Sequence, residues 1–462
     1  MSDLAALLQP DRGEPAVPIQ LIDREHWDHW LKKQSDRTRA ALGAQGFAGE
    51  AGRLAIVPGD KASWSALLGV DDMVRLGPWC LAKAAEALPQ GRYRLEGGAL
   101  GHAALGWVLG QYAFERYKKP KQPKSARVLL TPEPARIDET LLLARATNLV
   151  RDLVNTPAGD LGPAELEDAA RSLAEECGAT INVVSGRALQ DGFPMIAAVG
   201  QAAIPSRAPR LIELEWGNPA HPRIAIVGKG VVFDTGGLDI KPSSGMRLMK
   251  KDMGGAAHAL ALALLVMKMR LPVRLHLLVP AVENAISGGA FRPGDILKSR
   301  KGLTVEIGNT DAEGRLVLGD ALTKATEDKA ELILDFATLT GAARVALGPD
   351  LPALFANDDS LAEALLSAGA AVSDPAWRMP LWDGYDEMLA SDIADLGNVS
   401  DAPMAGAVTA ALFLRRFVPA ETPWAHFDTF AWRASARPGR PKGGDALGLR
   451  AAWAMLADRY GA

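Results

Sequence analysis

Apolar, β-branched runs alternate with helical patterns through the later part of the chain, and this alternation restricts the fold more than any other feature. Helical patterns occupy Pro163–Cys177 and Ala256–Met267. The strand-like runs around them are Ile181–Val184, Leu211–Leu214, Ile224–Val227, Leu275–Val279 and Leu332–Phe336. Repeated strand–helix–strand units predict an α/β fold with a mainly parallel sheet flanked by helices, and ligands bind such sheets at the carboxyl ends of their strands.

The preceding part of the chain predicts a smaller α/β domain. It has helical patterns at Leu81–Leu88 and Ala103–Leu109, and short apolar runs such as Leu54–Val57. The basic, proline-containing stretch Arg116–Arg127 is typical of a solvated linker beside a strand. A helix is expected at Asp138–Asn155, ending just before a proline. We therefore expect an N-terminal domain at 1–130, a linker helix at 131–160 and a larger domain at 161–462.

Composition excludes several classes of protein. The 462 residues carry 51 Lys and Arg against 55 Asp and Glu, a net charge of −4, whereas nucleic-acid and membrane-surface binders need a cationic excess. The two cysteines, Cys80 and Cys177, form no disulfide framework, which fits a reducing cytosol. The N-terminus has no signal pattern, and the longest apolar stretch, Ala259–Met267, is far shorter than the ~20 residues of a membrane span. We expect a soluble, cytoplasmic protein.

Two polar segments lie where strands of the predicted sheet end. The first, residues 224–257, is rich in glycine and carries Lys229, Asp234, Lys241 and Asp252. The second, NTDAEGRL at 309–316, carries Asp311, Glu313 and Arg315 at alternate positions. In an extended chain, residues two apart project to the same side, so we expect these three side chains to face one point.

Four converging carboxylates, Asp234, Asp252, Asp311 and Glu313, need compensation for their charge. Protonation, salt bridges to lysine and arginine, or a pair of divalent cations each supply it. Two cations bridged by oxygen ligands form the arrangement that activates water for hydrolysis. Acidic loops on an ordinary surface produce the same spacing, so the spacing alone leaves both interpretations open.

Other catalytic motifs are incomplete in this chain. The D-T-G sequence at Asp234 lacks the second copy that an aspartic peptidase needs. Gly228-Lys229-Gly230 lacks the serine or threonine of a phosphate-binding loop, and no HExxH occurs. We expect His426, in WAHFD, to be a hydrogen-bonded core residue and not a ligand.

The segments VGKGVVFDTGG, DIKP, MKKDMGGAA and NTDAEGRL, in this order and spacing, closely resemble the leucyl aminopeptidase (cytosol aminopeptidase) family of dinuclear metallo-aminopeptidases. ARATNLVRDLVNTPA, DFATLTGA, SDIADL, AGAVTAALFLRRF and WAHFD resemble the same family, so the resemblance covers roughly residues 140–450. LGQYAFERYKK resembles the end of the family's N-terminal domain, whereas residues 1–105 carry no matching motif. The domain at 161–462 is then expected to be a catalytic metallopeptidase domain.

The resemblance implies two divalent metal ions per subunit. Asp234 and Glu313 would bridge the ions, Lys229 and Asp252 would complete one ion's ligands, and Asp311 would complete the other's. Manganese or zinc is expected, with magnesium and cobalt as alternatives, because such ligands accept all four. Lysine binds a metal only as a neutral amine, so the pKa of Lys229 has to fall from about 10.4 to below about 7. Glycines on both sides of Lys229 allow the close backbone approach.

The resemblance also assigns residues to catalysis and to substrate binding. Lys241 and Arg315 would be the catalytic pair, with a bicarbonate held by the planar guanidinium of Arg315. Asp239 stands where the family commonly has a small polar residue, and we expect it to form an ion pair with Lys241, with competition for metal as the alternative. The residues expected to bind substrate are Met249, Asn309, Ala312, Thr338 and Gly341.

The implied reaction is hydrolysis of the first peptide bond by a metal-bridged hydroxide. The free α-amine of a peptide would bind one metal, and the pocket favours leucine- or methionine-like residues with broad tolerance. The resemblance further implies a homo-oligomer, a hexamer built from two trimers. A nucleic-acid-binding regulator on the same fold is the alternative; its local support is the Arg116–Arg127 stretch, and the net charge argues against it.

Overall fold

The computed structural model describes residues 4–97, 99–118 and 126–461, which form two compact units. Unit 1 comprises Met1–Asn148 with Ala434–Lys442, and unit 2 comprises Leu149–Arg433 with Gly443–Ala462. The division falls inside helix α5 (Ile137–Asn155), which confirms the helix expected there. Of the basic stretch Arg116–Arg127, residues 119–125 lie outside the described residues.

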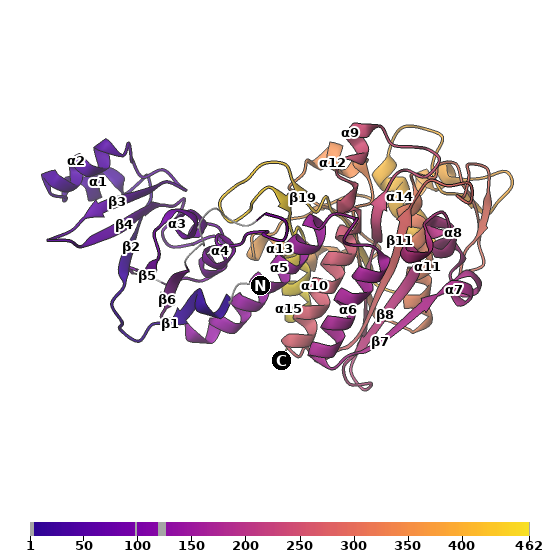
Figure 1. Cartoon of the computed structure of the whole chain (residues 1–462), viewed down its shortest axis with the longest axis horizontal. Helices are drawn as coiled ribbons and strands as arrows, with labels where there is room; N and C mark the ends of the chain where they lie inside the picture. The colour runs from indigo at the N-terminus through magenta and orange to yellow at the C-terminus, as the bar shows by residue number, and fades with distance from the viewer. Residues whose placement is uncertain (1–3, 98, 119–125, 462) are drawn as a thin grey trace. The chain divides into compact units, whose positions relative to one another are not determined.

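Unit 1 is a small α/β domain, as predicted (Figure 1). Its sheet has the order β1-β6-β5-β2-β4-β3, and every pair is parallel except β3 with β4. Tyr93 and Trp107 are fully buried in its core, with ring centroids 5.5 Å apart. Its strands are β1 (Leu8–Pro10), β2 (Val17–Ile22), β3 (Leu54–Pro58), β4 (Trp64–Gly69), β5 (Gly91–Leu95) and β6 (Arg127–Thr131). Its helices before α5 are α1 (Trp27–Lys32), α2 (Asp36–Ala44), α3 (Ala82–Ala87) and α4 (Ala103–Leu109).

The main sheet of unit 2 contains the five strands expected from the apolar runs. Its order is β16-β15-β18-β14-β9-β11-β8-β7, with β10 paired to β11. The four central strands β18, β14, β9 and β11 run parallel, whereas β15 and β8 are antiparallel to the central strands beside them. The strands are β7 (Thr180–Ser185), β8 (Arg210–Trp216), β9 (Arg223–Gly228), β10 (Gly230–Asp234), β11 (Arg274–Asn284), β14 (Leu332–Ala337), β15 (Ala353–Ala356), β16 (Trp377–Arg378) and β18 (Trp424–Asp428). The mainly parallel α/β architecture is confirmed.

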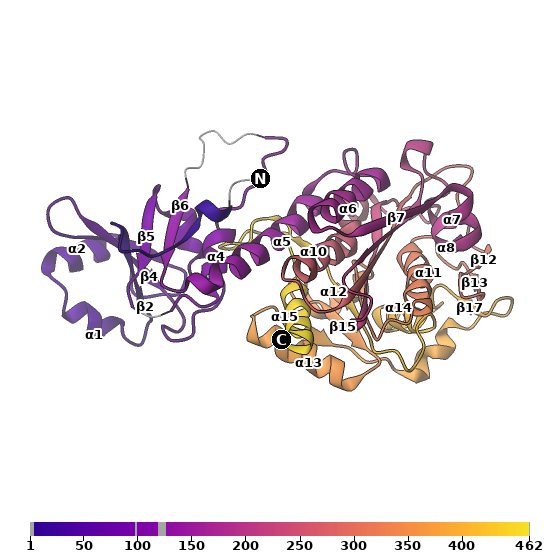
Figure 2. The same ribbon diagram turned by 90° about the horizontal axis from the view of Figure 1, so that it is seen from below.

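Helices cover both faces of this sheet (Figure 2). On one side lie α6 (Pro163–Cys177), α10 (Gly254–Lys268) and α15 (Leu449–Tyr460); on the other lie α8 (Pro194–Gly200), α11 (Glu313–Glu327) and α14 (Gly406–Arg415). The further helices are α7 (Gly186–Gly192), α9 (Ser243–Met246), α12 (Gly341–Leu347) and α13 (Asp359–Ala371). The short strands β12 (Ile296–Lys298), β13 (Thr304–Glu306) and β17 (Leu396–Gly397) form one small sheet, and β19 (Trp432–Arg433) pairs with β20 (Gly443–Gly444).

Helix α10 is buried along almost its whole length. Every residue except Lys268 is buried, because the helix packs on β9, β11 and β14 and is covered in turn by α15. A helix that is apolar all round belongs in the interior, which explains the long run of alanine and leucine. In the described part of the chain, no helix combines the length and the apolar character that a membrane crossing requires.

His426 is a core residue, as predicted. Its side chain on β18 is fully buried, and Nδ1 lies 2.5 Å from the Asp335 carboxylate on the neighbouring strand β14. The attraction to Asp335 outweighs the effect of burial, which alone would lower the pKa of His426, so that its pKa is raised. The pair therefore joins two central strands and does not face the cleft.

A second buried histidine, His258 in α10, has both ring nitrogens close to backbone groups. Its Nδ1 lies 2.7 Å from the Gly254 carbonyl, and its Nε2 accepts the backbone N–H of Leu447 at 3.0 Å. A proton on Nε2 would face that N–H group, and burial lowers the pKa of His258. A histidine whose pKa is lower in the folded state than in the unfolded chain stabilises the fold fully above the unfolded pKa of about 6.5. This contribution to the free energy of unfolding is lost as the pH falls below that value.

We therefore expect His258→Gln to weaken the pH dependence of stability. The wild type should lose more unfolding free energy than the variant between pH 7 and pH 5, by at most about 1.4 kcal/mol per pH unit. Urea unfolding followed by circular dichroism at several pH values measures this slope. His221→Gln, on an exposed loop, serves as the control. Equal slopes for wild type and His258→Gln would show that the buried imidazole does not titrate on unfolding.

Candidate metal centre and its cleft

A cleft of about 510 Å³ opens where β9, β10 and β14 end at their carboxyl edges. Lys229 follows β9, Asp234 ends β10, and Thr338 follows β14. These polar residues therefore lie at the carboxyl ends of the strands, where ligands bind in folds of this kind. All twelve residues selected from the sequence line this cleft: Lys229, Asp234, Lys241, Met249, Asp252, Asn309, Asp311, Ala312, Glu313, Arg315, Thr338 and Gly341.

Three of the four carboxylates form a tight, buried cluster. Asp234, Asp252 and Glu313 each offer one oxygen, and these atoms all lie within 4.8 Å of one another. The three side chains come from β10, from the 3₁₀ helix η4 (Met249–Met253) and from the first residue of α11. Their exposure is 2% or less, so water does not screen the repulsion between them.

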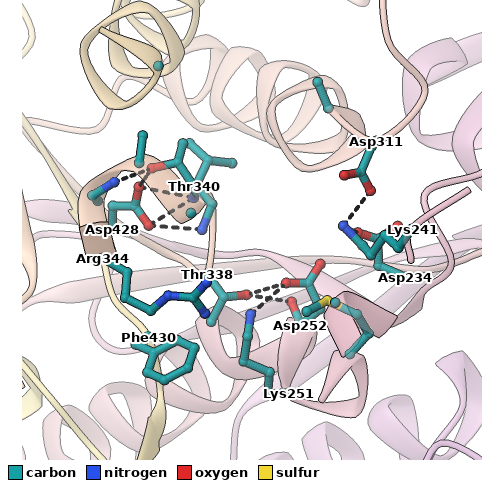
Figure 3. Close-up of a pocket in the computed structure, with 18 of the residues that line it drawn as sticks. Asp234, Lys241, Lys251, Asp252, Asp311, Thr338, Thr340, Arg344, Asp428 and Phe430 are labelled. Atoms are coloured by element: carbon teal, nitrogen blue, oxygen red, sulfur yellow. Dashed lines mark hydrogen bonds and ion pairs between the residues drawn. The ribbon is translucent and has the colours of Figure 1, made fainter. Parts of the chain in front are cut away.

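Two lysines bridge the carboxylates in pairs. Lys229 Nζ lies 2.6 Å from Asp252 Oδ2 and 2.9 Å from Glu313 Oε1. Lys241 Nζ lies 2.8 Å from Asp234 Oδ2 and also contacts Asp311 Oδ1 (Figure 3). Asp311 thus joins the centre through Lys241 and stands outside the group of three. Salt bridging, one of the three forms of compensation expected from the sequence, is present.

The lysines do not fully compensate the acids. Burial raises the pKa of Glu313, and the neighbouring charge of Asp234 raises it further, to about 8. Burial and Asp234 likewise raise the pKa of Asp311, to about 6. For Lys229, burial alone would lower the pKa, but the attraction of Asp252 and Glu313 outweighs it and raises the pKa. The centre therefore carries negative charge that the two lysines do not compensate.

These residues fit a divalent metal ion. Glu313 Oε2 is buried and has no hydrogen-bond partner among the residues that the structure describes. Buried carboxylate oxygens without partners are costly, and a cation satisfies them directly. Carboxylates together with a lysine nitrogen form a donor set suited to manganese, zinc, magnesium or cobalt. Lys229 would have to lose its proton to join such a set.

Glycines bring the backbone and the Lys229 side chain into place. A Cβ on Gly255, at the start of α10, would lie 2.1 Å from the Phe336 carbonyl oxygen and 2.8 Å from the Lys229 nitrogen. A Cβ on Gly314 would lie 2.6 Å from Lys229 Cε. At Gly255 the contacts are with backbone atoms, so only glycine fits there, whereas a side chain at Gly314 would have to displace the Lys229 side chain. The two glycines therefore let α10 and α11 approach Lys229 closely.

The extended conformation predicted for residues 309–316 is wrong. Asp311 lies in a turn, and α11 begins at Glu313, so alternate side chains do not face one side. Glu313 points to Lys229 while Asp311 points to Lys241. The two side chains point to different lysines because α11 begins at Glu313 and ends the loop there. The alternating charges in the sequence do not predict where this helix begins.

Arg315 is held by a loop that sequence reasoning did not select. Its Nη1 donates to the Asn398 carbonyl at 2.7 Å, and the Asn398 side chain accepts from Gly308 N at 2.8 Å and donates to Asn309 O at 2.7 Å. Asn398 thus fixes both ends of the 309–315 segment. A single asparagine in a loop gives no sequence signal of this role.

The expected ion pair between Asp239 and Lys241 does not form among the described residues. Asp239 is exposed, and its Oδ2 accepts the backbone N–H of Thr310 at 2.7 Å. The Thr310 hydroxyl also lies 3.1 Å from Asp239 Oδ2. Asp239 therefore ties the loop after β10 to the turn before α11, while Lys241 is paired with Asp234 and Asp311.

The cleft contains further residues that the sequence did not single out. Asp428, at the end of β18, accepts the backbone N–H groups of Leu339 at 3.0 Å and Thr340 at 3.1 Å, and the Thr340 hydroxyl at 2.6 Å. It fixes the path from β14 into α12. Lys251, Arg344 and Phe430 complete this wall of the cleft (Figure 3).

Buried carboxylates with an unsatisfied oxygen, lining an open cleft at the carboxyl ends of a parallel sheet, are the arrangement that metal-dependent hydrolytic enzymes use. The chain belongs to the cytosol aminopeptidase family. Residues 148–452 match the model of the cytosol aminopeptidase family, catalytic domain, and residues 17–131 match that of the M17 aminopeptidase, N-terminal domain. The family is a metal-dependent peptidase family, so the chain is an enzyme of this class.

Named relatives agree with this assignment. The chain is 41% identical over 399 residues to a probable cytosol aminopeptidase of Syntrophotalea carbinolica, with 80% of each chain covered. It is similar to the 1.8 Å crystal structure of cytosol aminopeptidase from Coxiella burnetii, with a TM-score of 0.92, 46% identity, and coverage of 98% of this chain and 99% of that one. It also resembles the bottromycin maturation enzyme BotP in complex with Mn, with a TM-score of 0.86, 32% identity, and coverage of 97% and 100%. These relatives give no support to a nucleic-acid-binding regulator.

We expect Gly314→Ala to displace the Lys229 side chain and to lower peptidase activity about 100-fold, because misplacement of a site group by about 1 Å has effects of this size. Bound metal should fall as well. The thermal midpoint should be retained, since alanine is the better helix former. Gly192→Ala in α7 is the matched control, because its nearest contact would be an ordinary 3.5 Å to Arg300 Nη1. Full activity in Gly314→Ala would contradict this role for the glycine.

Proposed function

We propose that the chain is an aminopeptidase with two metal ions that removes the N-terminal residue of peptides with a free N-terminus. The observation that carries this proposal is the buried group Asp234, Asp252 and Glu313, with oxygens within 4.8 Å of one another beside an open cleft. The family match supports peptide hydrolysis.

The proposed metal ligands are distributed over two ions. Asp234 and Glu313 would bridge them, Lys229 and Asp252 would complete one set, and Asp311 would complete the other. Asp311 fits a separate set because it meets the centre through Lys241 and lies outside the group of three. Manganese or zinc is proposed, with magnesium or cobalt as alternatives; manganese is the ion named for the similar structure of BotP.

When bound, the two ions would polarise the scissile carbonyl and lower the pKa of a water molecule between them. Lys241 is positioned to assist. Burial alone would lower its pKa, but the attraction of Asp234 outweighs this and the pKa is raised, so that Lys241 stays charged. Its ammonium lines the cleft, where it can donate a hydrogen bond to the carbonyl oxygen as negative charge develops there.

Arg315 is proposed to hold a bicarbonate that accepts the proton released by the attacking water. Its guanidinium lines the cleft and is anchored through one nitrogen to Asn398. Its Nε is buried and has no hydrogen-bond partner among the residues that the structure describes. A planar anion can accept hydrogen bonds from such a group.

The substrate pocket is proposed to be formed by five cleft residues. Met249 and Gly341 provide apolar surface, which suits leucine- or methionine-like side chains with broad tolerance. The others are Asn309, Ala312 and Thr338. Thr338 is fixed by its hydroxyl, which donates to the Asp252 carboxylate at 2.9 Å and so lies beside the metal ligands.

The proposal extends to domain roles, assembly and location. Residues 1–130 would be the N-terminal domain, 131–160 a linker helix and 161–462 the catalytic domain. A hexamer of two trimers is proposed, supported by large exposed apolar side chains on unit 2, with Val345, Trp377, Trp382, Ile393 and Met404 each at least 60% exposed. A cytoplasmic location is proposed from the named cytosol aminopeptidase relatives.

Hydrolysis of leucine p-nitroanilide by metal-stripped protein tests the function. Added Mn²⁺ or Zn²⁺ should restore cleavage, because the carboxylate cluster needs cations, whereas the N-acetylated substrate should stay intact, because its amine is blocked. A folded, metal-loaded protein that cleaves no member of a panel of amino-acid p-nitroanilides would contradict the proposal. Cleavage of the acetylated compound would contradict the amine requirement.

Glu313→Gln should lower metal content and reduce activity at least about 100-fold, because a neutral amide of the same size replaces a bridging carboxylate. The fold should be retained, as near-ultraviolet circular dichroism can show. Metal content is measured by mass spectrometry after dialysis. Glu327→Gln, on the same helix but paired with Arg300 at the surface, is the control and should keep both metal and activity. An active, metal-replete Glu313→Gln enzyme would rule out the bridging role.

A further inference from the structure

An arginine in the cleft wall has no acidic partner. Arg344 projects from α12, is exposed, and lines the cleft. Several other arginines of unit 2 meet carboxylates, for example Arg415 with Asp383 at 2.6 Å and Arg300 with Glu327 at 2.7 Å. Within the described ranges, no carboxylate lies in ion-pair distance of Arg344, and no group accepts a hydrogen bond from its guanidinium.

The guanidinium is nevertheless held in place. Its Cζ lies 4.7 Å from the ring centroid of Phe430, a residue of the short connection between β18 and β19 (Figure 3). Stacking on an aromatic face leaves the N–H groups free to donate within the guanidinium plane. It also restricts the side chain before a ligand arrives, which reduces the entropy lost on binding. A guanidinium fork of this kind matches a carboxylate.

The stack belongs to the side of the cleft that carries Asp252. Lys251 Nζ lies 5.6 Å from the same ring centroid and 3.2 Å from Asp252 Oδ1. Thr338 donates to Asp252 as well. Lys241 and Asp311 lie on the opposite side in the view of Figure 3. The Phe430 ring is thus connected through Lys251 to a proposed metal ligand.

The location of Arg344 determines which part of a bound peptide it can contact. If the free amine is bound at the carboxylate centre, the side chain of the N-terminal residue is attached to the carbon next to that amine. It therefore lies nearer to the centre than the second residue or the distant carboxyl end. An acidic side chain can then direct its carboxylate to Arg344 while its methylene groups stay in the apolar part of the pocket.

We propose that Arg344, stacked on Phe430, binds the side-chain carboxylate of an acidic N-terminal residue, with glutamate preferred over aspartate for its reach. The inference rests on the proposed aminopeptidase function and adds a substrate class to the apolar residues. Arg344 is a specificity-determining residue in this role and takes no part in bond cleavage.

The test compares the p-nitroanilides of glutamate and glutamine, which differ in charge but hardly in size and have no terminal carboxylate. The ratio of kcat/KM for glutamate to that for glutamine should fall at least about tenfold in Arg344→Met, as expected for loss of a charge-assisted hydrogen bond. Arg344→Lys should retain part of the ratio. In the wild type alone, the ratio should fall as salt rises, because the pair is exposed. Arg187→Met, on the exposed face of α7, makes the same change of charge outside the cleft and should leave the ratio unchanged.

Two further measurements separate this inference from the proposed function. Calorimetry of the metal-loaded enzyme with L-glutamate and L-glutamine should show the same loss of discrimination in Arg344→Met, independently of turnover. Arg344→Met should still cleave leucine p-nitroanilide, because the proposed role of Arg344 is in selection and not in bond cleavage. If leucine is cleaved but the glutamate-to-glutamine ratio does not depend on Arg344, the inference is wrong and the function stands. If Arg344 instead changes only the preference for Leu-Glu over Leu-Gln, the carboxylate belongs to the second residue and the assignment is overturned.

Discussion

The repulsion among four carboxylates at one sheet edge is the constraint on which the centre depends. Asp234, Asp252 and Glu313 are almost fully buried, and Asp311 is joined to them through Lys241. Lys229 and Lys241 each bridge two acids, yet the pKa values of Glu313 and Asp311 remain raised. Lys229 and Lys241 therefore leave part of the negative charge uncompensated, and divalent ions can compensate it.

The scaffold meets this constraint by rigid, close packing. Lys229 lies between β9 and β10, which both pair with β11, Asp234 ends β10, and Glu313 starts α11, which packs against β9 and β11. Gly255 and Gly314 remove the side chains that would otherwise block Lys229. Ligands on strand ends and a helix start are held more firmly than ligands on free loops, which suits a centre that tolerates little displacement.

A second wall of the cleft is built mainly from the segments that connect strands. It is formed by the connections after β14 and β18, which Asp428 ties together through the N–H groups of Leu339 and Thr340. Arg344 and Phe430 lie on these connections and stack on each other. The proposed metal ligands Lys229, Asp234 and Glu313 thus lie at strand ends and a helix start, whereas the proposed substrate selection falls to the connections that a rigid sheet supports.

The resemblance to the family supplied five of the twelve expected cleft residues, Met249, Asn309, Ala312, Thr338 and Gly341. The sequence alone predicted five strands of the main sheet, the helices between them and the seven charged residues of the cleft. It could do so because hydrophobic periodicity reports local structure and because glycine-rich segments with acids and lysines at strand exits are unusual. Tertiary structure decided which charges meet. It began α11 at Glu313, so that Asp311 and Glu313 face different lysines, and it joined Asp239 to Thr310. It also brought Asn398 to Arg315 across 83 positions, and Phe430 in the loop after β18 to Arg344 in α12. Local patterns carry no record of such pairings, because they arise only when distant segments pack against the same sheet.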